Sequence, residues 1–210
     1  MYNIPYFKES DEQTIKQFIQ QHPFAMLIGC AGNMPVATQV PLLYEEREGR
    51  TFLQGHIMRS TDHYKAFEKN NEVLCVFTGN HTYVSASWYT DPQTASTWNY
   101  MSVHAKGKIQ FLPEEDLIRI LQQTTAHFEN KAASPASFEK LSPEYVHRLA
   151  KAIIGFEIEV TTVENVFKLS QNRDEESYHN IISELHKGNA GSRAIATEME
   201  TRHSRLFDAD

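Results

Sequence analysis

The chain has 210 residues, 40% of them hydrophobic, and carries a net charge of −7 at pH 7. Broad affinity for nucleic acid depends on dense Lys and Arg, so this acidic balance argues against it. No apolar run approaches the roughly 20 residues of a membrane-crossing helix, and the N-terminus does not resemble a secretory signal. Cys30 and Cys75 each lie in an apolar strand-like run, so we expect two free thiols in a cytoplasmic protein.

The first quarter of the chain predicts one helix followed by antiparallel strands. Ser10 precedes an acidic first turn, and apolar residues at helical spacing then predict a capped helix that ends before Pro23. Alternating apolar residues and turn residues predict the elements that follow. We expect strands at 24–30, 35–44 and 52–58, with turns at 32–33 and 45–50.

A basic, hydroxyl-rich turn follows the third of these strands and leads into a short helix at 64–69. The N-terminus of a helix has unpaired N–H groups and a partial positive charge, so it can bind a phosphate. Arg59 offers a forked charged donor, while Ser60 and Thr61 offer hydroxyls. His63 lies in the first turn, within reach of the same anion. An ordinary helix cap at Ser60 or Thr61, with Arg59 in solvent, fits the local sequence equally well.

The clearest strand signal is the alternation from residue 98 to residue 111, which places apolar residues on one face and polar residues on the other. Two later helices begin at Pro113 and Pro143. Their apolar stripes comprise Leu117, Ile120, Leu121 and Phe128, and then Val146, Leu149 and Ile153. We also expect strands at 73–77, 83–88, 155–161 and 166–170, a loop at 90–97, and a helix at 174–187 closed by Gly188.

Antiparallel strands of this number, interrupted by helices, predict a mainly β, α+β fold that forms a closed or split barrel. We expect one domain over residues 1–188 and a polar tail or helix over residues 189–210.

The usual catalytic and metal motifs are missing. Ten histidines are present, but no H-x-x-x-H, C-x-x-C or paired-carboxylate spacing supports a metal site. Neither G-x-S-x-G nor G-x-G-x-x-G occurs in the required context. A cluster of aromatic and amide residues remains, whose polar members favour a partly wet ligand pocket or dimer interface over core packing. Its members are His81, Tyr83, Trp88, Tyr89, Trp98, Asn99 and Tyr100.

Several short segments follow one another along nearly the whole chain in the order of a known family. They are Pro35-Val-Ala-Thr38, Pro41-Leu-Leu43, Gly55-His56 with Arg59, Phe77-Thr-Gly79, His81-Thr-Tyr-Val-Ser85, Ser87-Trp-Tyr89, Thr97-Trp-Asn-Tyr100, Val103-His104, Gly155-Phe-Glu-Ile-Glu159 and Lys168-Leu-Ser-Gln-Asn-Arg173. In these segments the chain resembles the PaiB-like family of FMN-binding negative transcriptional regulators. That family belongs to the FMN-binding split-barrel superfamily, which also contains the pyridoxamine phosphate oxidases. The residues beyond about 188 carry none of the resemblance.

The resemblance implies a homodimer of split barrels with FMN bound between the subunits. Arg59, Ser60 and His63 would hold the phosphate, and the backbone of residues 38–40 would lie along the isoalloxazine. The cofactor-binding residues that it implies are Thr38, Gln39, Val40, His56, Arg59, Ser60, Thr61, His63, Trp98, Asn99, Lys168, Gln171 and Arg173, the last as a candidate substrate contact. Where close relatives are expected to carry an Asn-Pro-like pair, this chain has Thr61-Asp62. A carboxylate there is unfavourable beside a phosphate unless it points away.

Three hypotheses for function follow. The first is an FMN-binding protein, either a flavin oxidoreductase or a flavin-dependent regulator, in which the flavin supplies the redox chemistry. The second is a repressor that binds DNA directly, against which the acidic balance and the lack of a helix-turn-helix argue. The third is a split-barrel dimer that has lost its cofactor. No residue is identified as an obligatory acid or base, so the question of enzymatic activity stays open, as do the substrate or signal and the choice between flavin, haem and another flat ligand.

Overall fold

The computed structural model describes residues 1–2, 4–91, 93–129 and 134–208, so residue 92 of the predicted loop and residues 209–210 of the C-terminal segment lie outside it. The chain forms two compact units. The helical unit comprises Met1–Phe18, Thr78–Val103 and Glu164–Asp210, and the barrel unit comprises Ile19–Phe77 and His104–Val163. Strands β5, β6 and β7 contribute residues to both units.

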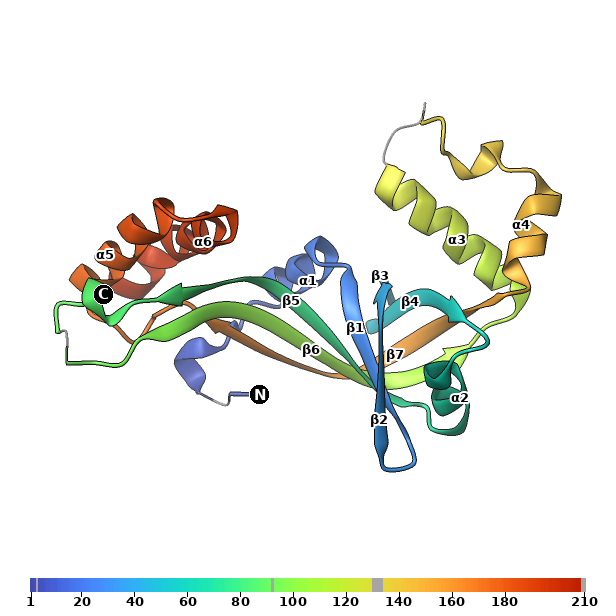
Figure 1. Cartoon of the computed structure of the whole chain (residues 1–210), viewed down its shortest axis with the longest axis horizontal. Coiled ribbons are helices and arrows are strands. Elements are labelled where there is room, and N and C mark those ends of the chain that lie inside the picture. Colours follow the sequence, from blue (N-terminus) through green and yellow to red (C-terminus); the bar gives the residue numbers. More distant parts are fainter. Residues whose placement is uncertain (3, 92, 130–133, 209–210) are drawn as a thin grey trace. The chain divides into compact units, whose positions relative to one another are not determined.

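Seven strands form one sheet in the order β2-β1-β5-β6-β7-β4-β3 (Figure 1). The strands are β1 (Phe24–Ala31), β2 (Met34–Pro41), β3 (Leu43–Arg47), β4 (Arg50–Met58), β5 (Glu72–Val84), β6 (Thr97–Phe111) and β7 (Ile153–Lys168). The α-helices are α1 (Glu12–Gln21), α2 (Asp62–Lys69), α3 (Glu114–Glu129), α4 (Pro143–Ala150), α5 (Glu175–His186) and α6 (Ala190–Phe207), and short 3-10 helices cover Pro5–Phe7, Ala86–Trp88 and Phe138–Lys140. The predicted α+β barrel architecture is confirmed. No helix among the described residues is long and apolar enough to cross a membrane.

The sheet curls on itself in the barrel unit because its two outermost strands are consecutive in the chain. Only Leu42 separates β2 from β3, and this residue is 2% exposed and donates its N–H to the carbonyl of Pro23 at 2.8 Å. A Cβ at Gly55 of β4 would lie 3.0 Å from the Pro41 oxygen, so glycine permits this close approach. The prediction of one continuous strand over 35–44 was therefore wrong, because the chain changes its pairing partner at Leu42.

Two tight hairpins connect the strands at both ends of the order. Gly32 and Asn33 form the first turn, as predicted, and Gly32 has a φ of 63°. The second turn is Glu48-Gly49, in which both residues have positive φ, as a two-residue turn between twisted strands requires. This turn is narrower than the predicted 45–50 because β3 and β4 pair up to Arg47 and Arg50.

The alternation in β6 predicts its core face correctly. Met101, Val103, Ala105 and Ile109 are all at most 6% exposed. In β5, Cys75 is completely buried opposite Leu27 of β1, and burial raises the pKa of its thiol to about 12. Both cysteines are free thiols, and Cys30 is half-buried.

Other boundaries differ from the prediction. The strands expected at 73–77 and 83–88 form one strand, β5, which ends at Val84 before a 3-10 turn, and those at 155–161 and 166–170 form the single strand β7. Backbone pairing continues through polar residues, which the side-chain pattern alone does not reveal. The segment beyond Gly188 was expected to be a polar tail or a helix, and residues Ala190–Phe207 form a helix, α6.

Two helices also differ in detail. The cap of α1 is Asp11, whose carboxylate accepts from the Thr14 N–H at 3.0 Å, rather than Ser10. Phe128 of α3 is 53% exposed because this helix buries only Leu117 and Ile120 near its start. Leu149 of α4 is 48% exposed. This helix buries only a narrow stripe, Val146 and Ala150, and Leu149 lies outside it.

Candidate functional site

The turn between β4 and α2 is fastened to the backbone by Arg59. Its N–H donates to the Ala152 carbonyl at 3.0 Å, and its Nε donates to the Ile153 carbonyl at 2.9 Å. These bonds orient the exposed guanidinium while they use only one of its side-chain nitrogens. The guanidinium also hydrogen-bonds the Tyr64 side chain, and its terminal nitrogens have the forked geometry that recognises a phosphate.

Thr61 is the cap of α2, one of the two residues to which the sequence left a capping role open. Its hydroxyl donates to the Met58 carbonyl at 2.8 Å and accepts from the Tyr64 N–H at 3.3 Å. The hydroxyl proton is thus directed at the protein backbone, while Ser60 is exposed beside it. Ser60 is the better hydroxyl donor for an anion at this turn.

Asp62 points into solvent, with a side chain that is 82% exposed. Its Oδ1 accepts from the His63 N–H at 2.8 Å and lies 3.2 Å from His63 Nδ1. The Asp62 carboxylate therefore bonds a backbone N–H at the start of the helix and points into solvent, an orientation compatible with an anion bound nearby. The His63 ring is largely buried, and its side chain is 13% exposed.

Tyr64 belongs to the same turn, although the sequence analysis did not single it out. Its hydroxyl donates to Glu68 at 3.0 Å. This hydrogen bond raises the pKa of Tyr64, and the nearby guanidinium of Arg59 opposes the rise. The signal that could have found it is its place in the first turn of α2, one residue after His63.

Gly29 of β1 sets the position of α2. A Cβ at this residue would lie 2.6 Å from Cε1 and 2.8 Å from Cδ1 of Phe67, which is 2% exposed. Carbon atoms normally keep about 3.5–4.0 Å apart, so only glycine lets the Phe67 ring seat here. The helix that begins at the Arg59 turn is therefore held by a specific close contact.

Residues 38–40 lie on β2, at one end of the sheet order. The described strands give β2 a single hydrogen-bonded neighbour, β1, so its other edge carries free backbone groups. Thr38 and Val40 pair with Leu27 and Ala25, both completely buried, while Gln39 pairs with the exposed Met26. The three residues therefore cannot present their side chains to one ligand, but alternate backbone groups of this edge can.

His56 of β4 has a buried polar atom without a partner. Its Nδ1 makes no hydrogen bond to any described residue, and burial lowers the pKa of the ring, which favours the neutral imidazole. His56 pairs with Gly155, where a Cβ would lie 3.1 Å from Cα of Leu117 in α3. An unpaired buried nitrogen is costly, so it marks a place where a ligand group can bond.

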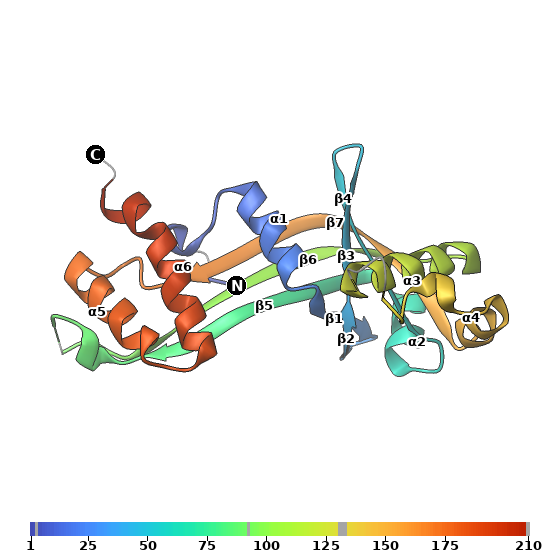
Figure 2. The same cartoon turned by 90° about the horizontal axis from the view of Figure 1, so that it is seen from above.

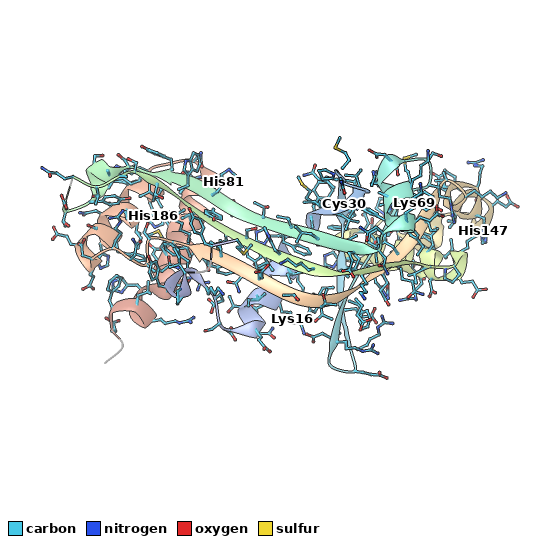
Figure 3. All side chains as sticks on the ribbon, turned by 90° about the horizontal axis from the view of Figure 1, so that it is seen from below. Lys16, Cys30, Lys69, His81, His147 and His186 are labelled. Atoms are coloured by element: carbon cyan, nitrogen blue, oxygen red, sulfur yellow. The ribbon has the colours of Figure 1, made fainter. Side chains whose placement is uncertain are left out.

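The remaining predicted residues lie in the helical unit. Trp98 is 54% exposed and meets Tyr83 edge to face, with ring centroids 6.0 Å apart, and the His81 ring also lies 6.0 Å away. Figure 3 labels His81 on its strand. These three residues are the part of the predicted aromatic cluster that is exposed, whereas Tyr89 and Asn99 are buried.

Lys168, Gln171 and Asn99 each hydrogen-bond to other groups of the protein. Lys168 Nζ donates to Thr97 Oγ1 and, at 2.8 Å, to the Trp98 carbonyl; burial lowers the pKa of this amine, and Arg173 lowers it further. The Gln171 amide closes a turn by accepting from the Leu169 N–H at 2.7 Å.

Asn99 is completely buried. Its Oδ1 accepts from Ser170 at 3.0 Å, and its Nδ2 donates to Met199 Sδ at 3.5 Å. Ser170 has a φ of 64°, an uncommon value for a residue other than glycine. The amides of Asn99 and Gln171 are thus used within the protein, and the prediction that they contact a cofactor gains no support from their surroundings.

Arg173 packs on an aromatic ring. Its guanidinium carbon lies 4.1 Å from the ring centroid of Tyr89, a cation–π contact. The Tyr89 hydroxyl is buried and has no hydrogen-bond partner among the described residues.

A charged hollow that the sequence analysis missed lies on the barrel unit. It measures about 560 Å³ and is lined by Arg47, Glu48, Arg50, Phe52, Asn71, Lys108, Ile109, Gln110, Glu157 and Glu159. Its main charges are paired, because Arg47 bonds Glu157 and Arg50 bonds Glu159 at 3.1 Å. It shares no residue with the predicted cofactor set.

A family model and a sequence relative both cover most of the chain. Residues 1–162 match the family described as "Putative FMN-binding domain". The protease synthase and sporulation protein PAI 2 of Bacillus subtilis is 32% identical over 203 residues, which span 96% of this chain and 98% of that protein. The chain belongs to this PaiB-like family. The resemblance stated from the sequence is thereby confirmed.

Solved structures that resemble this PaiB-like chain support the fold. The flavocytochrome Anf3 of Azotobacter vinelandii has a TM-score of 0.57 and 18% identity, covering 85% of this chain and 78% of its own. The FAD and heme binding protein of Mycobacterium smegmatis has a TM-score of 0.55 and 13% identity, covering 76% and 72%. The family match ends at residue 162, so Lys168, Gln171 and Arg173 lie beyond it.

Proposed function

We propose that the chain binds FMN, with the phosphate at the turn between β4 and α2. The observation that carries this proposal is the Arg59 guanidinium, oriented by a bond to the Ile153 carbonyl at the start of a capped helix. Ser60 and the N–H groups at the start of α2 supply further donors. The chain also belongs to a family described by FMN binding.

The flavin ring is proposed to lie along the free edge of β2, where the backbone of residues 38–40 offers donors and acceptors. His56 Nδ1, buried without a described partner, fits a polar group of the ligand. When bound, FMN supplies the electron chemistry, while the residues of this chain bind and orient it. Trp98, Lys168 and Arg173 remain candidates for contacts to the cofactor or its substrate.

The test compares FMN with riboflavin, which lacks the phosphate, in a fluorescence titration of the purified protein. Arg59→Ala is expected to weaken FMN binding by roughly 10- to 100-fold, since hydrogen bonds to charged groups contribute about 1.5–3 kcal/mol. Riboflavin affinity should stay unchanged. Arg50→Ala is the matched control, because Arg50 lies at the start of β4, the strand that leads into the Arg59 turn, and bonds Glu159 instead. A colourless protein that does not respond to FMN would support the alternative of a lost cofactor site.

We also propose that the protein is a homodimer. On β1, Ala25 and Leu27 are completely buried, yet the opposite face carries Phe24 and Met26, which are 62% and 41% exposed. A strand with two apolar faces is typical of a strand that is covered on both sides. Met26→Lys should lower the dimer fraction in sedimentation experiments, whereas Phe128→Lys, at a more exposed apolar position on α3, should not. A wild-type monomer would refute the proposal.

A regulatory role is the second part of the proposal. The Bacillus subtilis relative is named for protease synthesis and sporulation, and we infer that this chain acts in regulation through its flavin or a small-molecule signal. The net charge of −7 argues against direct DNA contact. Two free thiols suit the reducing cytoplasm, where we propose that it works. A mobility-shift assay at physiological salt should retain no genomic fragment.

A further inference from the structure

The helical hairpin of α5 and α6 brings together three side chains with metal-binding groups. The two helices pack side by side in the helical unit (Figure 2). Glu175 and His179 lie one turn apart on α5, and His203 lies on α6. Their ligand atoms all lie within 4.8 Å of one another. The three residues are not among those proposed to bind FMN.

The distances are close to those that an ion requires. Glu175 Oε1 lies 3.2 Å from His203 Nε2 and 3.9 Å from His179 Nε2. The two imidazole rings have centroids 4.5 Å apart and an interplanar angle of 36°. Two ligands about 2.1 Å from a tetrahedral ion lie roughly 3.4 Å apart. Small rotations of exposed side chains are therefore enough to close the site.

The state of His203 points to a missing ligand. Its Nε2 is buried and, despite its approach to Glu175, makes no hydrogen bond of good geometry with any described residue. Its ring is packed against Phe207 at 5.1 Å, which limits its freedom. By contrast, the His186–Glu200 pair, which also joins α5 to α6, forms a direct bond of 2.7 Å.

We propose that Glu175, His179 and His203 bind a divalent transition-metal ion that joins α5 to α6. Two imidazole nitrogens and one carboxylate oxygen suit zinc and its neighbours in the periodic table, whereas calcium and magnesium prefer oxygen ligands alone. Three protein ligands leave one position for water. Glu175 and His179 have a Glu-x-x-x-His spacing within α5, and the third ligand comes from another helix, α6.

The test is zinc binding by the full chain after removal of metals with a chelator. Isothermal titration calorimetry is expected to give a stoichiometry of one zinc ion per chain. Zinc should also raise the melting temperature of the protein, because an ion that binds only the folded state stabilises that state. His203→Ala and His179→Ala should each weaken zinc binding at least tenfold, since even indirect partners of a metal contribute roughly 10- to 100-fold.

His186→Ala is the matched control and should leave zinc affinity unchanged; Figure 3 labels His186 on α5. Glu175→Gln, a substitution of an exposed side chain, provides a second variant in case His203→Ala does not fold, and it should also lose zinc affinity. The proposal is overturned if the wild type binds no zinc, if Glu175→Gln keeps full affinity, or if His186→Ala loses as much as His179→Ala. The first two results would leave the cluster as ordinary ion pairs, and the third would place the zinc elsewhere on the helical hairpin.

Discussion

Replacing Gly29 with alanine tests whether a single close contact positions α2. The added Cβ would lie 2.6 Å from the Phe67 ring, about 1 Å closer than carbon atoms normally approach. Because Phe67 is 2% exposed, the ring cannot swing into solvent. Overpacking of this kind typically costs about 1–3 kcal/mol, and each kcal/mol corresponds to roughly 2–4 °C in the melting temperature of a chain of this size.

The assay is urea unfolding of four proteins: the wild type, Gly29→Ala, Phe67→Leu and the double variant. Leucine removes the ring atoms that clash, so Gly29→Ala should cost less than about 0.5 kcal/mol in the Phe67→Leu background, a coupling typical of residues in contact. Gly191→Ala is a control from α6, since the nearest atom to its Cβ is 3.4 Å away, and it should be neutral or stabilising by up to about 1 kcal/mol. Equal costs of Gly29→Ala in both backgrounds would refute the reasoning.

Two further predictions concern single groups. Thr61→Ala removes the α2 cap and should cost about 1 kcal/mol of unfolding free energy, whereas Thr61→Ser should keep most of this stability. An unchanged unfolding free energy for Thr61→Ala in urea unfolding would contradict the capping role. Burial opposes ionisation of Glu9, but hydrogen bonds from Arg202 and Arg205 outweigh it and keep the Glu9 pKa below its usual 4.5. A carboxyl whose pKa is lower in the folded state than in the unfolded state contributes stability at pH values above its unfolded pKa. This contribution is lost as the pH falls through the folded pKa. Glu9→Gln should therefore flatten the fall in unfolding free energy below pH 4.5, and an unchanged slope would argue against it.

Local sequence patterns predicted most helices and strands because the apolar side chains in each of them repeat with the spacing of a helix or of a strand. The alternation from Met101 to Ile109 and the Ser142-Pro143 helix start are examples, and the cap at Ser142 accepts the Tyr145 N–H at 3.3 Å. The turn at Arg59 could also be identified from the sequence as a candidate anion site, because a guanidinium and two hydroxyls before a helix are typical donors to a phosphate. Its attachment to the backbone of residues 152–153 was not, because those partners lie far along the chain.

Features that depend on tertiary packing escaped prediction. The sequence gives no sign that pairing changes at Leu42, since both flanking segments have strand character. Asn99 has the polarity of a ligand-binding residue, yet its partners Ser170 and Met199 come from segments about 70 and 100 residues away. The proximity of His203 to Glu175 depends likewise on how α5 and α6 pack.

Because Cys75 is completely buried, the rate at which its thiol reacts can be used to measure local unfolding of the barrel unit. A thiol with a pKa of about 12 forms almost no thiolate at neutral pH, and no reagent reaches Cys75 in the folded protein because the residue is completely buried. Alkylation at this position therefore requires β5 to separate from its neighbour. In a Cys30→Ser variant, Cys75 is the remaining thiol. The rate at which an alkylating reagent labels Cys75 under native conditions would then measure how frequently the barrel strands separate, without any introduced probe.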